Sequence, residues 1–134
     1  MPLRAYYEDE FATIFCGDCR EILPHIQRAD LILSDPPYGI RSVRGGRTFG
    51  KGNLCPTNDY MPVSGDDGPF DPGLLLSRGT PAILWGANHY ASRLPDASRW
   101  LVWDKRVEYR SNPLADCELA WTSLGGPARM FRFV

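Results

Sequence analysis

The sequence predicts an α/β fold with an open, at least partly parallel sheet. Four apolar runs have the length of buried strands, at residues 31–33, 81–85, 100–103 and 118–122. Such short runs favour strands over helices. Stretches with helical character separate several of them, and this alternation is typical of sheets whose parallel strands are joined by helices.

Two further elements are predicted before the first of these runs. Residues 11–16 form an apolar segment that stops at Gly17, which indicates a buried strand. The next segment, 20–27, is expected to form a short helix, with Asp18 as the residue that caps its N-terminus.

The middle of the chain is expected to contain a long loop and two short helices. Residues 41–68 are rich in Gly, Pro, Asn and Asp and lack a periodic apolar pattern, which indicates a mobile loop. A helix is predicted over 72–77, because Asp71 can cap it and Pro72 suits its first position. A second short helix is predicted over 88–94.

The composition indicates one soluble domain over residues 1–134, with 43% hydrophobic and 23% charged residues. A net charge of −1 excludes a generally basic surface, so any contact with nucleic acid must come from a local patch. The chain has no apolar run of membrane-spanning length, and its first ten residues lack the layout of a secretion signal. We therefore expect a cytoplasmic protein without a membrane partner.

The most informative segment is Asp35-Pro36-Pro37-Tyr38-Gly39, which follows the run at 31–33 almost directly. Prolines fix φ and remove backbone donors. A carboxylate and a carbonyl can then accept both hydrogen bonds of one amino group, while the aromatic ring stacks on a flat ligand. The segment predicts a pocket for the exocyclic amine of a nucleobase, at the strand end where open α/β sheets bind ligands. A simple tight turn is the alternative.

This segment resembles the catalytic motif of DNA amino-methyltransferases, which transfer a methyl group from S-adenosylmethionine to N6 of adenine or N4 of cytosine. Aspartate at the first position is more typical of the adenine enzymes. The resemblance continues through 15–19, 83–88, 100–105 and 117–121, although only 35–39 is highly specific. It implies a class I S-adenosylmethionine-dependent methyltransferase-like (Rossmann-like) sheet and an enzyme that methylates a flipped adenine.

The resemblance also implies roles for individual residues. Asp35, Pro36, Pro37 and Tyr38 would form the pocket of the target base, with Asp35 and a Pro36 carbonyl as acceptors for the amine and Tyr38 stacked on the ring. The protein's contribution would be positioning and electrostatics.

The residues implied for the cofactor are Asp18, Cys19 and Asp35. In the resembled family, the acid that corresponds to Asp18 and the next backbone N–H, here of Cys19, contact the adenine of S-adenosylmethionine. The alternative for Asp18 is that it only caps the following helix.

The order of the motifs resembles that of circularly permuted DNA methyltransferases, because only 34 residues precede Asp35. The Asp-Pro-Phe-x-Gly-x-Gly and Pro-Thr-x-Lys-Pro elements expected downstream are absent. We therefore expect the N-terminal portion of such an enzyme, with an incomplete sheet and a complementing C-terminal chain or segment as partner. The alternatives are a non-catalytic DNA-binding or assembly fragment of a truncated or split enzyme, and a cytosine N4 methyltransferase.

A basic stretch beside the motif is the candidate for contact with double-stranded DNA. Arg41, Arg44, Arg47 and Lys51 have no acid among them, which favours a salt-sensitive contact with the phosphate backbone over a solvated loop. The same stretch nearly fits a phosphate-binding P-loop, but Gly52 stands where that motif needs a hydroxyl.

Two cysteines form a Cys16-x-x-Cys19 pair, which would suit a redox or zinc module as a third class of function. A zinc site would also need Cys55 and Cys117, which are isolated in the sequence. We expect thiols, with Cys16 packed at the end of a buried strand, and no metal.

Overall fold

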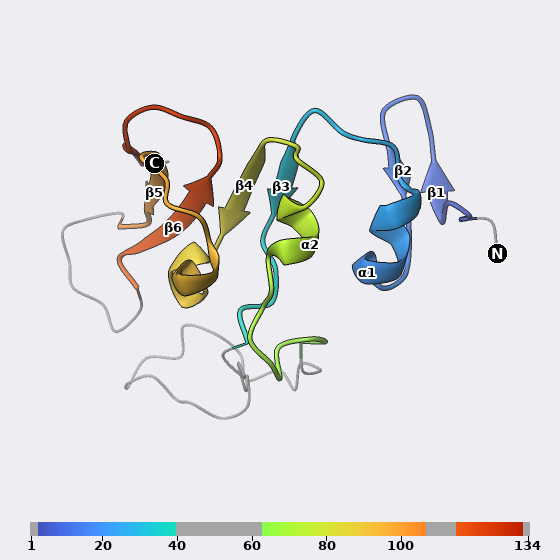
Figure 1. Ribbon diagram of the computed structural model, residues 1–134, viewed down its shortest axis with the longest axis horizontal. Coiled ribbons are helices and arrows are strands. Elements are labelled where there is room, and N and C mark those ends of the chain that lie inside the picture. Colours follow the sequence, from blue (N-terminus) through green and yellow to red (C-terminus); the bar gives the residue numbers. More distant parts are fainter. Residues whose placement is uncertain (1–2, 40–62, 107–114, 133–134) are drawn as a thin grey trace. The chain divides into compact units, whose positions relative to one another are not determined.

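The computed structural model describes residues 3–39, 63–106 and 115–132 (Figure 1). It divides the chain into two units, Met1–Asp30 and Leu31–Val134. The expectation of one methyltransferase-like domain over 1–134 stays a prediction.

The smaller unit contains a two-stranded antiparallel sheet, in which β1 (Tyr7–Glu8) pairs with β2 (Thr13–Ile14). Asp9 holds the turn between them, because its Oδ1 accepts hydrogen bonds from the N–H groups of Phe11 (2.8 Å) and Ala12 (2.7 Å). No sequence pattern predicted β1, which is only two residues long. The strand predicted within 11–16 corresponds to β2. Both residues of β2 are exposed, as are those of β1, so the prediction of a buried strand is wrong.

A short helix follows, α1 (Cys19–Ile22), and Asp18 is its N-cap as predicted. The Asp18 Oδ1 atom accepts a hydrogen bond from the Arg20 N–H at 2.8 Å. The chain then tightens into a 3₁₀ turn, η1 (Leu23–His25). The helix is shorter than predicted because Pro24 has no N–H to donate to the preceding turn.

The larger unit is built on a five-stranded sheet with the order β3-β4-β6-β5-β7. β3 is parallel to β4 and β5 is parallel to β7, whereas β6 is antiparallel to both β4 and β5. All strands except β6 therefore run in one direction, which confirms an α/β fold with a partly parallel sheet. The strands are β3 (Ile32–Ser34), β4 (Ala82–Trp85), β5 (Trp100–Asp104), β6 (Cys117–Thr122) and β7 (Arg129–Arg132).

Four of these strands lie where the apolar runs predicted them, and β7 adds the apolar segment near the end of the chain. The prediction that the run at 31–33 is a buried strand is wrong in its burial: Leu31 and Leu33 are exposed, by 44% and 66%, and Ile32 is only partly buried. Among the strands that the structure describes, β3 lies at an edge of the sheet and pairs only with β4, so it lacks the cover that a central strand has.

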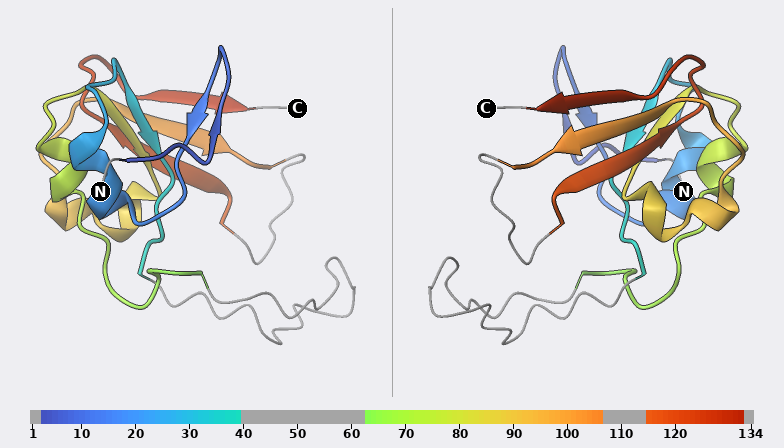
Figure 2. Two further views of the ribbon diagram at one scale, coloured as in Figure 1. Left: turned by 90° about the vertical axis from the view of Figure 1, so that its right-hand side faces the viewer. Right: turned by 90° about the vertical axis from the view of Figure 1, so that its left-hand side faces the viewer.

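Short helical elements connect the strands: α2 (Gly73–Leu76) and the 3₁₀ turns η2 (Ala87–His89) and η3 (Ala91–Arg93). Figure 2 shows them on the same side of the sheet. The predicted helix over 88–94 is replaced by the two 3₁₀ turns, because Tyr90 between them has φ −136° and ψ 26°, outside the helical region.

α2 begins as the sequence suggested in one respect only. The Asp71 Oδ1 atom accepts a hydrogen bond from the Gly73 N–H at 2.9 Å, but Pro72 precedes the helix instead of being its first residue.

The core of the larger unit lies along the central strands. Leu84 in β4 and Trp121 in β6 are register partners and both are buried. The Trp121 indole N–H donates to the Pro95 carbonyl at 2.9 Å, which satisfies its one polar atom. Among the described residues, the other buried apolar side chains of this core are Leu75, Ala82, Ala87, Tyr90 and Ala120. Within the described part of the chain, no helix is both long and apolar enough to cross a membrane.

Candidate functional site

The predicted motif lies at the carboxyl end of β3, since Asp35 directly follows the last residue of the strand. Pro36 is buried, whereas Asp35 is exposed. The fold therefore anchors the turn through its first proline and leaves the carboxylate accessible to a ligand.

The carboxylate and the aromatic ring of the motif are in direct contact. The Tyr38 hydroxyl donates a hydrogen bond to Oδ1 of Asp35 at 2.5 Å. Burial and this hydrogen bond raise the pKa of Tyr38 above its ordinary value of 10. Tyr38 therefore remains a neutral donor at physiological pH and holds one carboxylate oxygen in place.

Two residues that follow β4, Gly86 and His89, fix the Tyr38 ring. His89 stacks on it with a centroid distance of 4.8 Å and an interplanar angle of 13°. Gly86 has φ 66°, and a Cβ atom built on it would lie 1.9 Å from Cε1 of the tyrosine. Only glycine fits this position. The sequence did not predict a role for His89 in this site, because a single histidine without the spacing of metal ligands is expected to be a surface residue.

The other side of the motif is held by a residue that the sequence did not single out. Asp66, whose exposed fraction is 6%, accepts a hydrogen bond from the Gly39 N–H at 2.8 Å. Gly39 has φ 74°, and a Cβ atom there would lie 2.2 Å from the Gly68 carbonyl oxygen. The segment 63–68 thus packs against the end of the motif.

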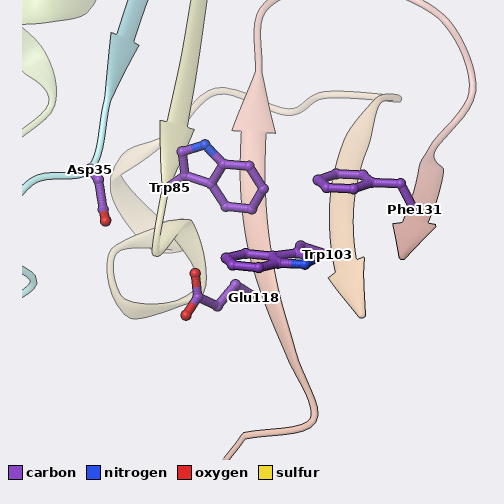
Figure 3. Close-up of a pocket in the computed structure, with 5 residues that line it drawn as sticks. All are labelled: Asp35, Trp85, Trp103, Glu118 and Phe131. Carbon is purple, nitrogen blue, oxygen red and sulfur yellow. The ribbon is translucent and has the colours of Figure 1, made fainter. Parts of the chain in front are cut away.

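A hollow of about 380 Å³ opens beside Asp35. Three aromatic rings form its walls, and Trp85 meets both of the others edge to face, at centroid distances of 6.4 Å to Trp103 and 6.2 Å to Phe131. Figure 3 shows these rings together with the carboxylates of Asp35 and Glu118. A volume and lining of this kind are typical of small-ligand sites, which combine apolar walls with a few polar groups.

Strand register explains why the hollow forms. Trp103 in β5 is the register partner of Glu118 in β6 and of Phe131 in β7, so the three side chains stand on one face of the sheet. Lys105 Nζ donates to Oε1 of Glu118 at 2.7 Å. The sequence offered no way to connect these residues, since their proximity depends on the order of the strands.

The residues predicted to contact the cofactor, Asp18 and Cys19, lie in the smaller unit. The N–H of Cys19 is a first-turn donor without an intrahelical acceptor, which fits a ring nitrogen. The Asp18 carboxylate is engaged by the Arg20 guanidinium, with Nε 3.0 Å from both oxygens, and this hydrogen bond lowers its pKa to about 2. Asp18 fits an amine only if Arg20, whose side chain is 79% exposed, releases it.

The residues predicted to contact DNA, Arg41, Arg44, Arg47 and Lys51, all lie outside the described residues. The DNA contact therefore stays a prediction.

The cysteines among the described residues are free thiols: Cys16, Cys19 and Cys117. Cys16 is exposed, so the expectation that it packs at the end of a buried strand is wrong. In the described ranges, no group of three His, Cys, Asp or Glu side chains is placed to hold a metal ion. Cys55 lies outside them.

A buried ionic cluster stands at the end of β5. The Asp104 carboxylate is 2% exposed and accepts hydrogen bonds from Arg106 Nε at 2.9 Å and Arg132 Nε at 3.1 Å. Both arginines, Arg106 more than Arg132, hold the pKa of this carboxyl below its ordinary range. The cluster ties β7 to β5.

Comparison with protein-family models, with curated proteins and with solved structures found no match to this chain.

Proposed function

We propose that this chain carries the target-base site of a site-specific DNA methyltransferase, which transfers a methyl group from S-adenosylmethionine to the N6 amine of an extruded adenine. The position of Asp35 carries the proposal. Its carboxylate stands at the carboxyl end of a strand in an open α/β sheet, where such sheets bind ligands. It also borders a hollow with aromatic walls, which suits a flat base.

The chemistry follows from the acceptors that Asp35 presents. Its Oδ1 is held by the Tyr38 hydroxyl, and among the described residues its Oδ2 has no hydrogen-bond partner. A hydrogen bond from the amine to Oδ2 favours a pyramidal nitrogen, whose lone pair is then available for attack. Pro36 and Pro37 keep the carboxylate in this orientation because their φ angles are fixed.

S-adenosylmethionine, when bound, would supply the electrophilic methyl group. In the smaller unit, the groups that would contact it are the Cys19 N–H and Asp18 after release of Arg20. The Asp-Pro-Phe-x-Gly-x-Gly element is absent from this sequence, so the proposal includes a complementing segment or chain that completes a class I methyltransferase-like sheet, and double-stranded DNA as the substrate.

The test compares Asp35→Ala with Asp96→Ala, a matched change at an exposed carboxylate in the loop before β5. The 134-residue chain is incubated with duplex DNA and radiolabelled S-adenosylmethionine, and the modified nucleosides are identified. In the same samples, 2-aminopurine placed in the duplex reports base extrusion, which needs no methyl donor.

From the chain alone we expect extrusion of 2-aminopurine by wild type and by Asp96→Ala, and a weaker response in Asp35→Ala. N6-methyladenine is expected when the complementing segment is also present, and Asp35→Ala should then lose at least about 100-fold of the rate. Formation of N4-methylcytosine would establish the cytosine alternative instead. DNA binding without transfer, unaffected by Asp35→Ala, would leave the non-catalytic fragment as the function. Absence of both DNA binding and transfer would refute the proposal for this chain.

A further inference from the structure

Glu118 shares the aromatic hollow with Asp35 but belongs to a different strand. It lies in β6, opposite Trp103 in the register, and its carboxylate projects into the same space as that of Asp35 (Figure 3). Nothing in the motif at 35–39 requires a second carboxylate here. The motif therefore does not explain why this carboxylate lies beside three aromatic rings.

The walls of the hollow favour a planar ligand. Trp85 and Trp103 meet edge to face, as do Trp85 and Phe131, so the faces and edges of the rings line the space at steep angles to one another. Phe131 is 43% exposed and both tryptophans are partly exposed. Aromatic surface that remains accessible at the carboxyl end of a sheet can stack on a flat ring.

The polar atoms in the hollow select for hydrogen-bond donors. Tyr38 holds Oδ1 of Asp35, and Lys105 holds Oε1 of Glu118. Among the described residues, Oδ2 of Asp35 and Oε2 of Glu118 have no partner. An ionised carboxylate only accepts hydrogen bonds. A ligand that presents an amine satisfies these oxygens, whereas one that presents a carbonyl brings a second acceptor against them.

We infer that Glu118 is a specificity-determining residue of this site, and that the hollow selects planar rings with an exocyclic amine over the same rings with a carbonyl. The inference rests on the proposed function, because it takes the ligand to be a nucleobase. Adenine and cytosine carry the amine; hypoxanthine and uracil are their carbonyl counterparts. Lys105 fixes one oxygen of Glu118 through an ion pair.

The experiment uses the full 134-residue chain and short single-stranded oligonucleotides, which present a base without the cost of extrusion. Two oligonucleotides differ at one position, adenine or hypoxanthine, and binding is followed by tryptophan fluorescence. The variant is Glu118→Gln, whose amide can donate to a carbonyl. Asp116→Asn, at an exposed carboxylate near the start of β6, is the matched control. Trp100→Phe checks the source of the signal, since Trp100 pairs with the buried Trp121 on the other face.

We expect wild type, Asp116→Asn and Trp100→Phe to prefer adenine over hypoxanthine by about 10-fold or more, the scale that one hydrogen bond to a charged group contributes. Glu118→Gln should lose this preference, with weaker binding of adenine and stronger binding of hypoxanthine. Its urea midpoint should equal that of wild type within error, so that the change reports the ligand and not the fold.

Two results would overturn the inference: an unchanged preference in Glu118→Gln, or no binding of either oligonucleotide. The assay contains no methyl donor. A Glu118-dependent preference for adenine, together with no methyl transfer even when the complementing segment is present, would therefore refute the proposed function and leave the selectivity of the hollow standing. Transfer that depends on Asp35 but not on Glu118 would refute only this inference.

Discussion

Replacing Gly86 by alanine tests whether Tyr38 is fixed against the end of β4. An alanine Cβ would lie 1.9 Å from Cε1 and 2.2 Å from Cζ of the tyrosine ring, distances that no real pair of carbon atoms tolerates. The backbone at this position also has φ 66°, a region that residues with a side chain rarely adopt. The ring must move, and the Asp35 carboxylate then loses its contact with the Tyr38 hydroxyl.

The two effects can be separated with a second glycine. An L-residue in the left-handed region costs about 1–2 kcal/mol. Overpacking against the ring adds about 1–3 kcal/mol, so Gly86→Ala should lower the free energy of unfolding by about 2–5 kcal/mol. Gly79 has φ 61°, but a Cβ there would meet nothing within 4 Å. Gly79→Ala should therefore cost only the first term, and the difference between the variants isolates the overlap with Tyr38.

Urea denaturation followed by tryptophan fluorescence measures both variants in the larger unit, which contains every tryptophan of the chain: Trp85, Trp100, Trp103 and Trp121. A double variant, Tyr38→Ala with Gly86→Ala, removes the ring and should recover the steric part, as a double-mutant cycle detects. Equal destabilisation by Gly86→Ala and Gly79→Ala, or no coupling to Tyr38, would refute this account of the site.

Three further outcomes are expected. Leu84→Ala, at a fully buried position, should lower the free energy of unfolding by about 2–5 kcal/mol in the same urea assay. Leu33 is 66% exposed on the neighbouring strand, so Leu33→Ala should change this free energy by about 0.5 kcal/mol or less. Since the folded-state pKa of Asp104 is lowered, its ionised form stabilises the fold above a pH of about 4, and this contribution is lost as the pH falls further; urea midpoints of Asp104→Asn should show a smaller acid loss than wild type. An NMR titration should give Asp18 a pKa of about 2, and Arg20→Ala should return it toward about 3.9.

Local signals were sufficient for the strands and for the position of the motif. The apolar runs placed β4, β5 and β6 within one residue of their ends, and a turn after 31–33 placed Asp35 at a strand end. The helical segments were predicted less well, because a proline or a single non-helical residue such as Tyr90 limits a short helix.

The residues around Asp35 are brought there by tertiary structure, so no local sequence pattern predicted them. Glu118 reaches the hollow through the antiparallel insertion of β6 between β4 and β5. His89 reaches the tyrosine because the chain turns at Gly86. Asp66 accepts a hydrogen bond from the N–H of Gly39, which lies 27 residues earlier in the chain. These contacts are set by strand order and register, which cannot be predicted from any single segment of the sequence.

The position of β3 at the sheet edge has a consequence for the order of folding. β3 shares three register pairs with β4, and Ile32 meets Ala82 across 50 residues of chain (82 − 32). β5 and β6 share five pairs, and the nearest of them, Asp104 with Cys117, spans 13 residues (117 − 104). Closing the longer loop costs more conformational entropy, and fewer pairs compensate for it. We therefore expect β3, which Asp35 directly follows, to be added last and released first, so that the site would open without loss of the sheet.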